Sequence, residues 1–211
     1  MDHEVVFSYS ARYCKLGNIS PQTKVLWFVL HGYGQLAPYF IKKFQVLNDM
    51  GHCVIAPEGL NRFYNKGFSG RVGATWMTNE DRLKDIENYI NYLNSIYLQE
   101  IPSNPAFQIN ILGFSQGAAT ASRWVTQSAV HFDSLILWAG IFPSDMNMEL
   151  SKKRLHGKKI VFVVGFNDPF VSNEILSEQN ELALGMEVSP NIITFDGGHD
   201  IDSKILRKIA G

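Results

Sequence analysis

The sequence predicts an α/β fold in which a mostly parallel sheet is covered by helices on both faces. Two observations lead to this prediction. Short apolar runs of β-branched, aromatic and aliphatic residues alternate along the chain with longer segments of helical periodicity. The run Val25–Leu30 contains no polar residue, which is typical of a strand buried on both faces of a parallel sheet. Because the chain has 211 residues, we expect one domain that spans residues 1–211.

The first half of the chain begins with a loosely alternating segment, Val5–Lys15, that predicts one or two edge strands. After the strand Val25–Leu30, apolar residues at helical spacing predict a helix over Tyr39–Asp49, which Gly51 ends. A short strand, Cys53–Ala56, comes next. Asn61–Thr75 is polar, aromatic and rich in glycine, and we interpret it as a long loop of the kind that is often functional.

The second half begins with Thr78, which we expect to cap a long amphipathic helix that ends before Pro102. Lysines and an arginine gather between Lys152 and Lys159, and we interpret that run as a solvated loop that leads into a strand. The remaining expected elements, from apolar runs and helical periodicity, are strand Phe107–Leu112, helix Gln116–Gln127, strands Ser134–Trp138 and Ile160–Val164, helix Glu174–Leu184, strand Asn191–Phe195 and helix Ser203–Ala210.

Composition excludes several function classes. The formal net charge of -1 offers no electrostatic attraction for nucleic acid or an anionic membrane. The longest apolar run is too short to span a bilayer, and the N-terminal residues Met1–Glu4 do not resemble a secretory signal. The two cysteines, Cys14 and Cys53, form no metal-binding pattern and are expected to be reduced. These observations favour a cytoplasmic protein without integral membrane association.

A nucleophile motif follows the expected strand that ends at Leu112. Residues 113–117 read Gly-Phe-Ser-Gln-Gly, which has the form G-x-S-x-G with Ser115 at its centre. The expected strand ends directly before the motif, and a helix rich in small residues is expected directly after Ser115. That context favours a sharp turn that exposes the serine hydroxyl over an ordinary loop that happens to contain a serine.

The motifs together resemble the phospholipase/carboxylesterase family of α/β-hydrolases, which includes acyl-protein thioesterases and small bacterial carboxylesterases. The resemblance extends over nearly the whole chain from Val25 onward. It implies the α/β-hydrolase fold, a serine esterase activity and no cofactor or metal. The segments that carry it are residues 30–34 (Leu-His-Gly-Tyr-Gly), residues 112–117 around Ser115, Ala56-Pro57, Trp76, residues 165–169 (Gly-Phe-Asn-Asp-Pro) and Gly198-His199.

An oxyanion hole needs two hydrogen-bond donors. One donor is expected to be the backbone amide of Gln116, which follows the nucleophile. The resemblance implies that the other is the amide of Tyr33, in a glycine-containing loop directly after a buried strand. We expect His31 in the same loop to hold the loop by hydrogen bonding and not to act as a base.

In this fold the catalytic residues follow the chain order serine, acid, histidine. His199 follows the last strand through two glycines and is the expected base, whereas His156 lies among lysines before a strand begins. Asp168 follows the strand before that of the histidine, where the family places its acid. Asp145, which follows the preceding strand, remains the alternative. Three further aspartates are too close in sequence to His199, namely Asp196, Asp200 and Asp202.

Substrate contacts are expected from residues in loops near the strand ends. The resemblance points to Trp76 and the region of Phe170 as walls of an acyl pocket, and Met77 beside Trp76 is a further candidate. The segment between Ala139 and Gly157 is too short for a helical lid, so we expect no lid domain. Other aromatic candidates are Phe63, Tyr64, Phe68 and Phe142, each of which is as consistent with packing.

The resulting hypothesis is a serine hydrolase that cleaves carboxylic esters or thioesters of short to medium acyl chains through an acyl-serine intermediate. Ser115 is the nucleophile, His199 the general base and Asp168 the acid that orients it. A lysophospholipase or an acyl-protein thioesterase is an alternative within the same chemistry. A peptidase or a non-catalytic binding module on the same fold is an alternative of a different class. The expected partner is a small-molecule acyl substrate.

Overall fold

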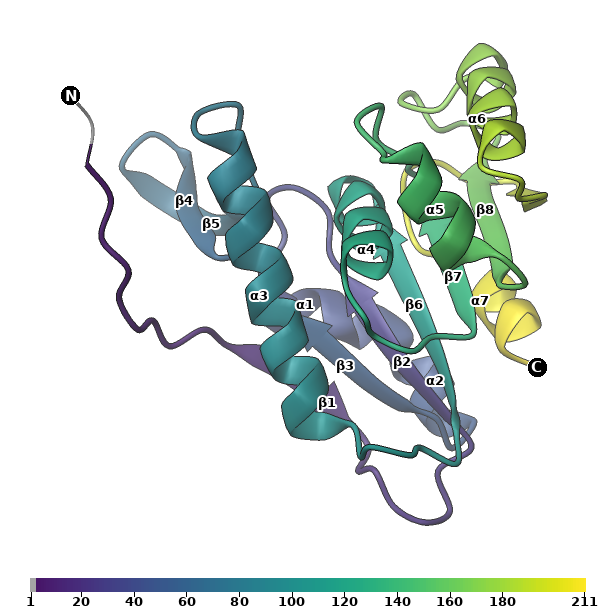
Figure 1. Ribbon diagram of the computed structural model, residues 1–211, viewed down its shortest axis with the longest axis horizontal. Helices are drawn as coiled ribbons and strands as arrows, with labels where there is room; N and C mark the ends of the chain where they lie inside the picture. Colours follow the sequence, from purple (N-terminus) through teal and green to yellow (C-terminus); the bar gives the residue numbers. More distant parts are fainter. Residues whose placement is uncertain (1–2) are drawn as a thin grey trace.

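A seven-stranded sheet lies at the centre of the computed structural model, which describes residues 3–211 (Figure 1). Along the sheet the strands are β1 (Tyr13–Leu16), β3 (Cys53–Pro57), β2 (Val25–Leu30), β6 (Gln108–Phe114), β7 (Ser134–Trp138), β8 (Lys159–Gly165) and β9 (Asn191–Phe195). β1 is antiparallel to β3, and every other neighbouring pair is parallel. The predicted mostly parallel sheet is therefore confirmed.

Strand β2 shows how the apolar runs specify this sheet. Leu26 and Phe28 point into one hydrophobic core cluster, whereas Trp27 and Val29 point into another on the opposite face. All four side chains are fully buried. A strand that is covered on both faces needs apolar residues at every position, as the sequence pattern indicates.

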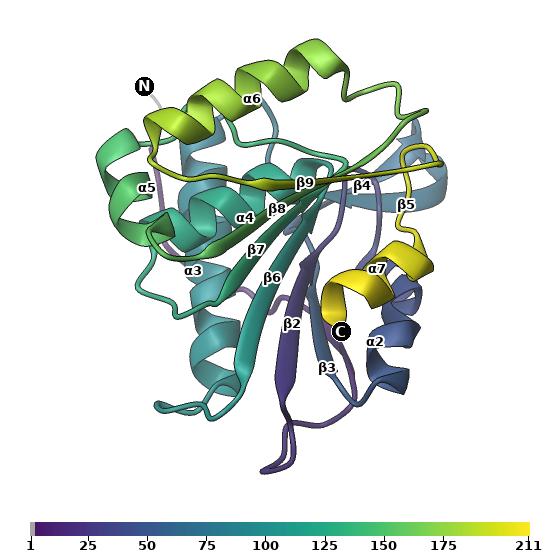
Figure 2. The same cartoon turned by 90° about the vertical axis from the view of Figure 1, so that its right-hand side faces the viewer.

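Helices cover both faces, as Figure 2 shows. On one face lie α3 (Arg82–Glu100), α4 (Gln116–Gln127), α5 (Met148–Leu155) and α6 (Asn173–Gly185). On the other lie α1 (Ala37–Phe40), the short 3-10 helix η1 (Ile41–Phe44), α2 (Gln45–Asp49) and α7 (Ser203–Ala210). This arrangement is that of the α/β-hydrolase fold expected from the sequence.

The expected loop over Asn61–Thr75 is wrong, because this segment forms a hairpin of β4 (Asn61–Lys66) and β5 (Ser69–Thr75). Two of the glycines that suggested a loop adopt positive φ angles, Gly67 with 54° at the turn and Gly70 with 88° near the start of β5. Most residues of β4 are exposed to solvent on both faces. A strand of this kind has no apolar alternation, so its sequence pattern resembles that of a loop.

The boundaries of several helices and strands differ from expectation. The helix expected over Tyr39–Asp49 consists of the three short helices α1, η1 and α2. α3 begins after Asp81, whose φ of 47° is left-handed. Thr78 therefore does not cap α3, and its backbone amide instead donates to the Asp85 carboxylate at 3.1 Å. Of the expected edge strands in Val5–Lys15, only the stretch from Tyr13 forms a strand.

The cationic run before β8 was wrongly expected to be a loop, because most of it lies in α5. Asn147 caps this helix by accepting a hydrogen bond from the Leu150 amide at 2.9 Å. Lys152, Lys153 and Arg154 occupy its last turn, where positive charge interacts favourably with the helix dipole. The Arg154 guanidinium also donates to the Val125 carbonyl at 2.9 Å, so this cation holds α5 against the end of α4.

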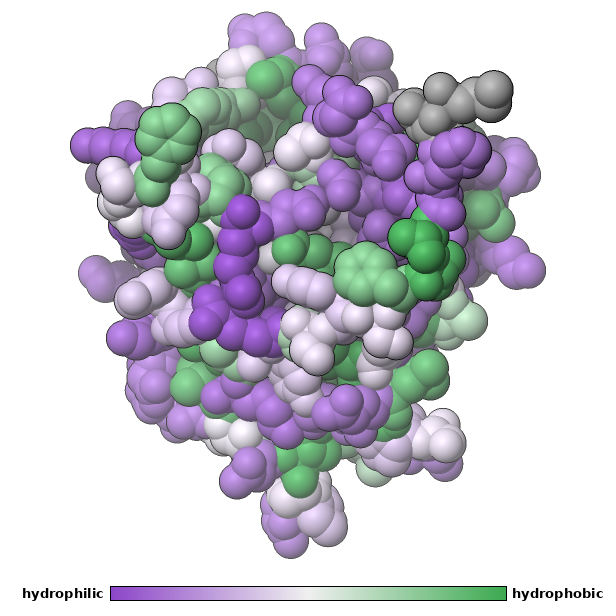
Figure 3. Space-filling view, turned by 90° about the vertical axis from the view of Figure 1, so that its left-hand side faces the viewer, coloured by the Kyte–Doolittle hydropathy of each residue, from purple (hydrophilic) through white to green (hydrophobic). Residues whose placement is uncertain are grey.

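The surface mixes residue types. Figure 3 shows hydrophilic and hydrophobic residues side by side on the face seen from the left of Figure 1. Phe68, in the β4–β5 turn, is almost fully exposed. No helix among residues 3–211 is long and apolar enough to cross a bilayer.

Candidate active site

Ser115 lies at a sharp turn between β6 and α4, with φ of 54° and ψ of −120°. Its amide donates to the Trp138 carbonyl at 2.9 Å, which holds the turn against β7. The flanking glycines are required by close backbone contacts. A Cβ atom on Gly113 would lie 2.2 Å from the Gly117 carbonyl oxygen, and one on Gly117 would lie 2.2 Å from that of Leu30. The motif therefore forms the strand–turn–helix element that exposes a nucleophile.

Asp168 and His199 form a hydrogen-bonded pair at the carboxyl ends of β8 and β9. His199 Nδ1 lies 2.9 Å and 3.1 Å from the two oxygens of Asp168, whose side chain is buried. One of these oxygens also accepts from the Phe170 amide at 2.9 Å. When Nδ1–H donates to the carboxylate, Nε2 is left as the acceptor that a general base requires.

Close contacts between two loops bring the pair together. The Asn167 amide donates to the Gly197 carbonyl at 2.9 Å. A Cβ on Gly165 would lie 2.3 Å from the same carbonyl oxygen, so the loops after β8 and β9 touch along their backbones. The His199 ring also lies 4.9 Å from the ring of Phe114, the residue before Ser115. The imidazole is thus placed beside the strand end that carries the serine.

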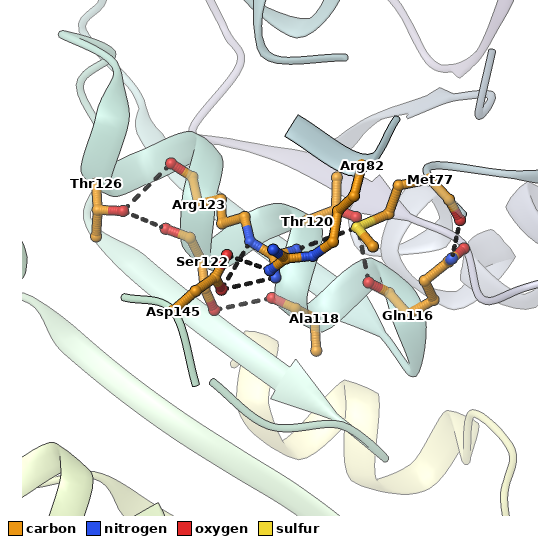
Figure 4. Close-up of polar contacts among 9 residues, drawn as sticks. All are labelled: Met77, Arg82, Gln116, Ala118, Thr120, Ser122, Arg123, Thr126 and Asp145. Atoms are coloured by element: carbon orange, nitrogen blue, oxygen red, sulfur yellow. Dashed lines mark hydrogen bonds and ion pairs between the residues drawn. The ribbon is translucent and has the colours of Figure 1, made fainter. Parts of the chain in front are cut away.

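Asp145, the alternative acid, lies in a different set of contacts (Figure 4). One of its oxygens accepts from Arg123 Nη2 at 2.8 Å and from Nε at 3.2 Å, and the other accepts from Arg82. Burial raises the pKa of this carboxyl, but the two arginines outweigh burial and hold the pKa below its usual value. Asp145 makes no hydrogen bond to His199, so the geometry favours Asp168 as the acid.

His31 holds the loop after β2 through both ring nitrogens. Nδ1 lies 2.8 Å from the Gly32 carbonyl oxygen, and Nε2 accepts from the Gly59 amide at 2.9 Å. The side chain is fully buried, and burial lowers its pKa to about 4. A neutral ring with both nitrogens occupied has no capacity to act as a base, which agrees with the structural role expected for it.

The two expected oxyanion donors, the amides of Tyr33 and Gln116, have no protein acceptor among residues 3–211. Gln116 is the first residue of α4, where an amide has no partner within the helix. The loop that carries Tyr33 touches Ser115, since a Cβ on Gly32 would lie 3.1 Å from the Ser115 Cβ. Both amides therefore lie near Ser115 without a protein acceptor in the described part of the chain, as the predicted oxyanion hole requires.

The predicted substrate-binding residues have different environments. Phe170 is exposed and its ring lies 4.7 Å from that of His199. Met77 is half-buried, whereas Trp76 is buried and donates from Nε1 to the His31 carbonyl at 2.8 Å. Their contact with substrate stays a prediction, and the burial of Trp76 favours a role in holding the loop.

The remaining aromatic candidates are dispersed. Phe142 is buried in the core, with its ring 5.5 Å from that of Phe162, so it does not line an open site. Phe63 packs on the Tyr33 ring at 5.0 Å. Tyr64 and Phe68 are exposed on the hairpin. No three His, Cys, Asp or Glu side chains gather as metal ligands in the described part of the chain.

Sequence reasoning missed the polar side chains that hold the oxyanion loops. Gln35 accepts a hydrogen bond from the Gly32 amide at 2.9 Å, and the Thr75 hydroxyl contacts the side chain of Gln116. Thr75 and Gln116 are separated by 41 residues. No periodicity or motif marks such a pair, so only the folded chain reveals it.

Comparisons with known proteins support the fold and identify the family. The model of the family described as serine hydrolase (FSH1) matches residues 19–205. One similar solved structure is esterase PE8, with 21% identity and a TM-score of 0.69 over 95% of this chain and 100% of that chain. Acyl-protein thioesterase 2 of Zea mays has 16% identity and a TM-score of 0.70 over 95% of this chain and 96% of that chain. The carboxylesterase of Bacillus cereus has 16% identity and a TM-score of 0.68 over 95% of this chain and 92% of that chain. Identities this low establish a common fold. No curated protein sequence matches the chain significantly.

Proposed function

The chain belongs to the serine hydrolase (FSH1) family, and from this premise we propose that it cleaves carboxylic esters or thioesters through an acyl-serine intermediate at Ser115. Membership in this family makes the protein an enzyme and supports the resemblance to small serine esterases found in the sequence. The choice of ester or thioester follows similar structures that are an esterase, a carboxylesterase and an acyl-protein thioesterase.

The proposed mechanism gives each of the site residues described above a role. Ser115 Oγ attacks the acyl carbonyl while His199 Nε2 takes the hydroxyl proton. The amides of Tyr33 and Gln116 stabilise the tetrahedral oxyanion. The intermediate collapses as His199 returns the proton to the leaving alcohol or thiol. Water, activated by His199, then attacks the acyl-serine and releases the acid, and Asp168 orients the imidazole in both steps.

The strained backbone of Ser115 is the observation that carries this proposal. A non-glycine residue at φ of 54° costs on the order of 1–3 kcal/mol and persists only where the surrounding structure enforces it. The Ser115 side chain is not buried, so packing of the side chain does not require this conformation. Asp81 also has a positive φ, but its ψ of 38° is that of the ordinary left-handed region, whereas the ψ of −120° at Ser115 lies outside it. A nucleophile at a strand–helix turn needs a strained backbone of this kind to project from the sheet.

Replacement of the nucleophile tests the proposal. Ser115→Ala should lower kcat for a short p-nitrophenyl ester by at least about three orders of magnitude while the circular dichroism spectrum stays native. Ser128→Ala, at the other end of α4, is the matched control and should retain activity. A fluorophosphonate probe should label Ser115 in the wild-type protein. If Ser115→Ala keeps more than a few per cent of activity, the nucleophile is assigned wrongly.

A substrate panel separates the alternative activities. Esters, thioesters, lysophospholipids and anilides of graded acyl length should be compared by kcat/KM. Hydrolysis of the anilide at a rate comparable to that of the ester would favour a peptidase, and preference for lysophospholipid would favour a lysophospholipase. The cytoplasmic location is also a proposal, which cell fractionation tests.

A further inference from the structure

Residues Ala74–Met77, the last two residues of β5 and the two that follow it, lie against the loop that carries Tyr33. We call these four residues the bracket. The Gly34 amide donates to the Ala74 carbonyl at 2.9 Å, and the Ala74 amide donates to the Gln35 carbonyl at 3.2 Å. The Trp76 indole donates to the carbonyl of His31 at 2.8 Å. The bracket is therefore bonded to the oxyanion loop on both sides of Tyr33.

The same four residues are bonded to the side chain of Gln116. Gln116 Nε2 donates to the Met77 carbonyl at 3.0 Å and to Thr75 Oγ1 at 2.9 Å. Gln116 Oε1 accepts from the Trp76 amide at 3.2 Å. Figure 4 shows the Gln116 side chain reaching from the start of α4 to Met77. One carboxamide thus contacts three consecutive residues of the bracket.

A second contact with α4 lies behind the bracket. The buried guanidinium of Arg123 donates from Nη1 to the Met77 sulfur at 3.7 Å and is itself held by Asp145. Gln116 and Arg123 are on the same helix, so Met77 is held at its carbonyl and at its side chain by α4 (Figure 4). The bracket cannot shift relative to α4 without loss of several of these contacts.

We propose that the carboxamide of Gln116 is a positioning group that fixes the distance between the two oxyanion amides by binding the bracket. This inference rests on the proposed function, because it assumes that the amides of Tyr33 and Gln116 bind the oxyanion. These amides come from loops more than 80 residues apart, and no hydrogen bond joins them directly. The bracket provides the link, with the oxyanion loop on one side and the Gln116 side chain on the other.

The proposed positioning depends on the hydrogen bonds of Gln116 and Thr75 and not on the volume of their side chains. Gln116 is half-buried and Thr75 is buried. Gln116 Nε2 donates to Thr75 Oγ1 at 2.9 Å, and the single hydroxyl proton of Thr75 has the Met77 carbonyl as an acceptor at 2.8 Å. A methionine at 116 would fill similar space without donating or accepting, and a valine at 75 would keep the shape of threonine without the hydroxyl. Because stabilisation of an oxyanion depends on donor placement to well under 1 Å, loss of the link should act on the transition state more than on substrate binding.

The experiment compares Gln116→Met and Gln116→Glu with the matched control Gln179→Met. Gln179 is buried and, like Gln116, binds a loop by accepting from a backbone amide, that of Phe142 at 2.8 Å, but it has no contact with the bracket. Both Gln116 variants should lower kcat for a short acyl ester about 10- to 100-fold with KM changed by less than about threefold. Affinity for a boronic acid that mimics the tetrahedral anion should fall by the same factor. Gln179→Met should lower unfolding stability and leave kcat unchanged.

Thr75→Val supplies an independent arm that leaves position 116 intact. Thr75→Val should reproduce part of the loss in kcat seen in Gln116→Met. In the double variant, kcat should fall by less than the product of the two single-variant fold-changes, because both substitutions remove the same link. If Gln116→Met, Gln116→Glu and Thr75→Val all keep wild-type kcat and boronic acid affinity, the inference is wrong. That outcome is distinguishable from failure of the proposed function, in which Ser115→Ala itself retains activity.

Discussion

Acidification should destabilise this protein through His31, because the ring is neutral when folded and fully buried. Its two nitrogens are committed to Gly32 and Gly59, and a proton on Nε2 would face the Gly59 amide hydrogen instead of accepting from it. Burial lowers the pKa from 6.5 to about 4, against smaller opposing effects of the Gly32 carbonyl and Glu58. Between these values the unfolded chain binds more protons than the folded one, so folding stability rises with pH.

The magnitude follows from the shift. A lowering of the pKa from 6.5 to about 4 corresponds to about 3.5 kcal/mol at about 1.4 kcal/mol per pKa unit. This contribution is fully present above about pH 6.5 and is lost as the pH falls toward about 4. It is a large fraction of the stability of an ordinary domain, which is about 5–15 kcal/mol.

Urea denaturation of the wild-type protein and of His31→Gln, from about pH 7.5 to about pH 4.5, measures this contribution. The variant should be less stable at neutral pH, and the difference between the two proteins should shrink steadily as the pH falls. His156→Gln, which replaces an exposed histidine, is the control and should follow the wild-type profile. If His31→Gln shows the same pH dependence as the wild type, the buried neutral histidine is not the origin of the acid sensitivity.

Three further predictions follow from the contacts. Asp168→Asn should lower kcat in an ester assay by about four orders of magnitude because it favours the wrong imidazole tautomer. Asp145→Asn should lower kcat far less. A larger loss of kcat in Asp145→Asn than in Asp168→Asn would make Asp145 the acid. Gly117→Ala should destabilise by several kcal/mol, at least ~3 kcal/mol in urea denaturation, because its Cβ would lie 2.2 Å from the Leu30 carbonyl oxygen; native stability would refute that contact. Phe68→Ser should change stability by less than about 0.5 kcal/mol, since the side chain is 98% exposed.

The sequence determined those parts of the fold whose local pattern and tertiary environment agree. β2, β7, β9, α4 and α7 have the bounds expected from periodicity. β2 and β7 are apolar enough to be buried on both faces, and α4 and α7 are amphipathic enough to cover one. β9 is a mostly exposed edge strand whose apolar and β-branched residues predicted its bounds. The glycines around Ser115 are equally local, because a sharp turn between strand and helix requires them wherever it occurs.

The local sequence pattern predicted the wrong secondary structure where a strand is exposed or a helix is interrupted. β4 carries polar residues on both faces, so nothing in its sequence distinguished it from a loop. The segment Ala37–Asp49 has helical spacing, but its hydrogen bonding changes to a 3-10 turn between Ile41 and Phe44. These differences depend on what packs against the segment, which apolar spacing alone does not record.

The folded chain alone decided which polar side chains meet. Gln116 contacts Thr75 across 41 residues, and Asp145 contacts Arg82 across 63. The sequence placed Asp145 as the alternative acid because it follows a strand, but its partners come from α3 and α4. A hydrogen bond acts over about 3 Å in space, and separation along the chain does not encode that distance. Motifs therefore predicted which residues carry the chemistry, and tertiary packing decided what holds them in place.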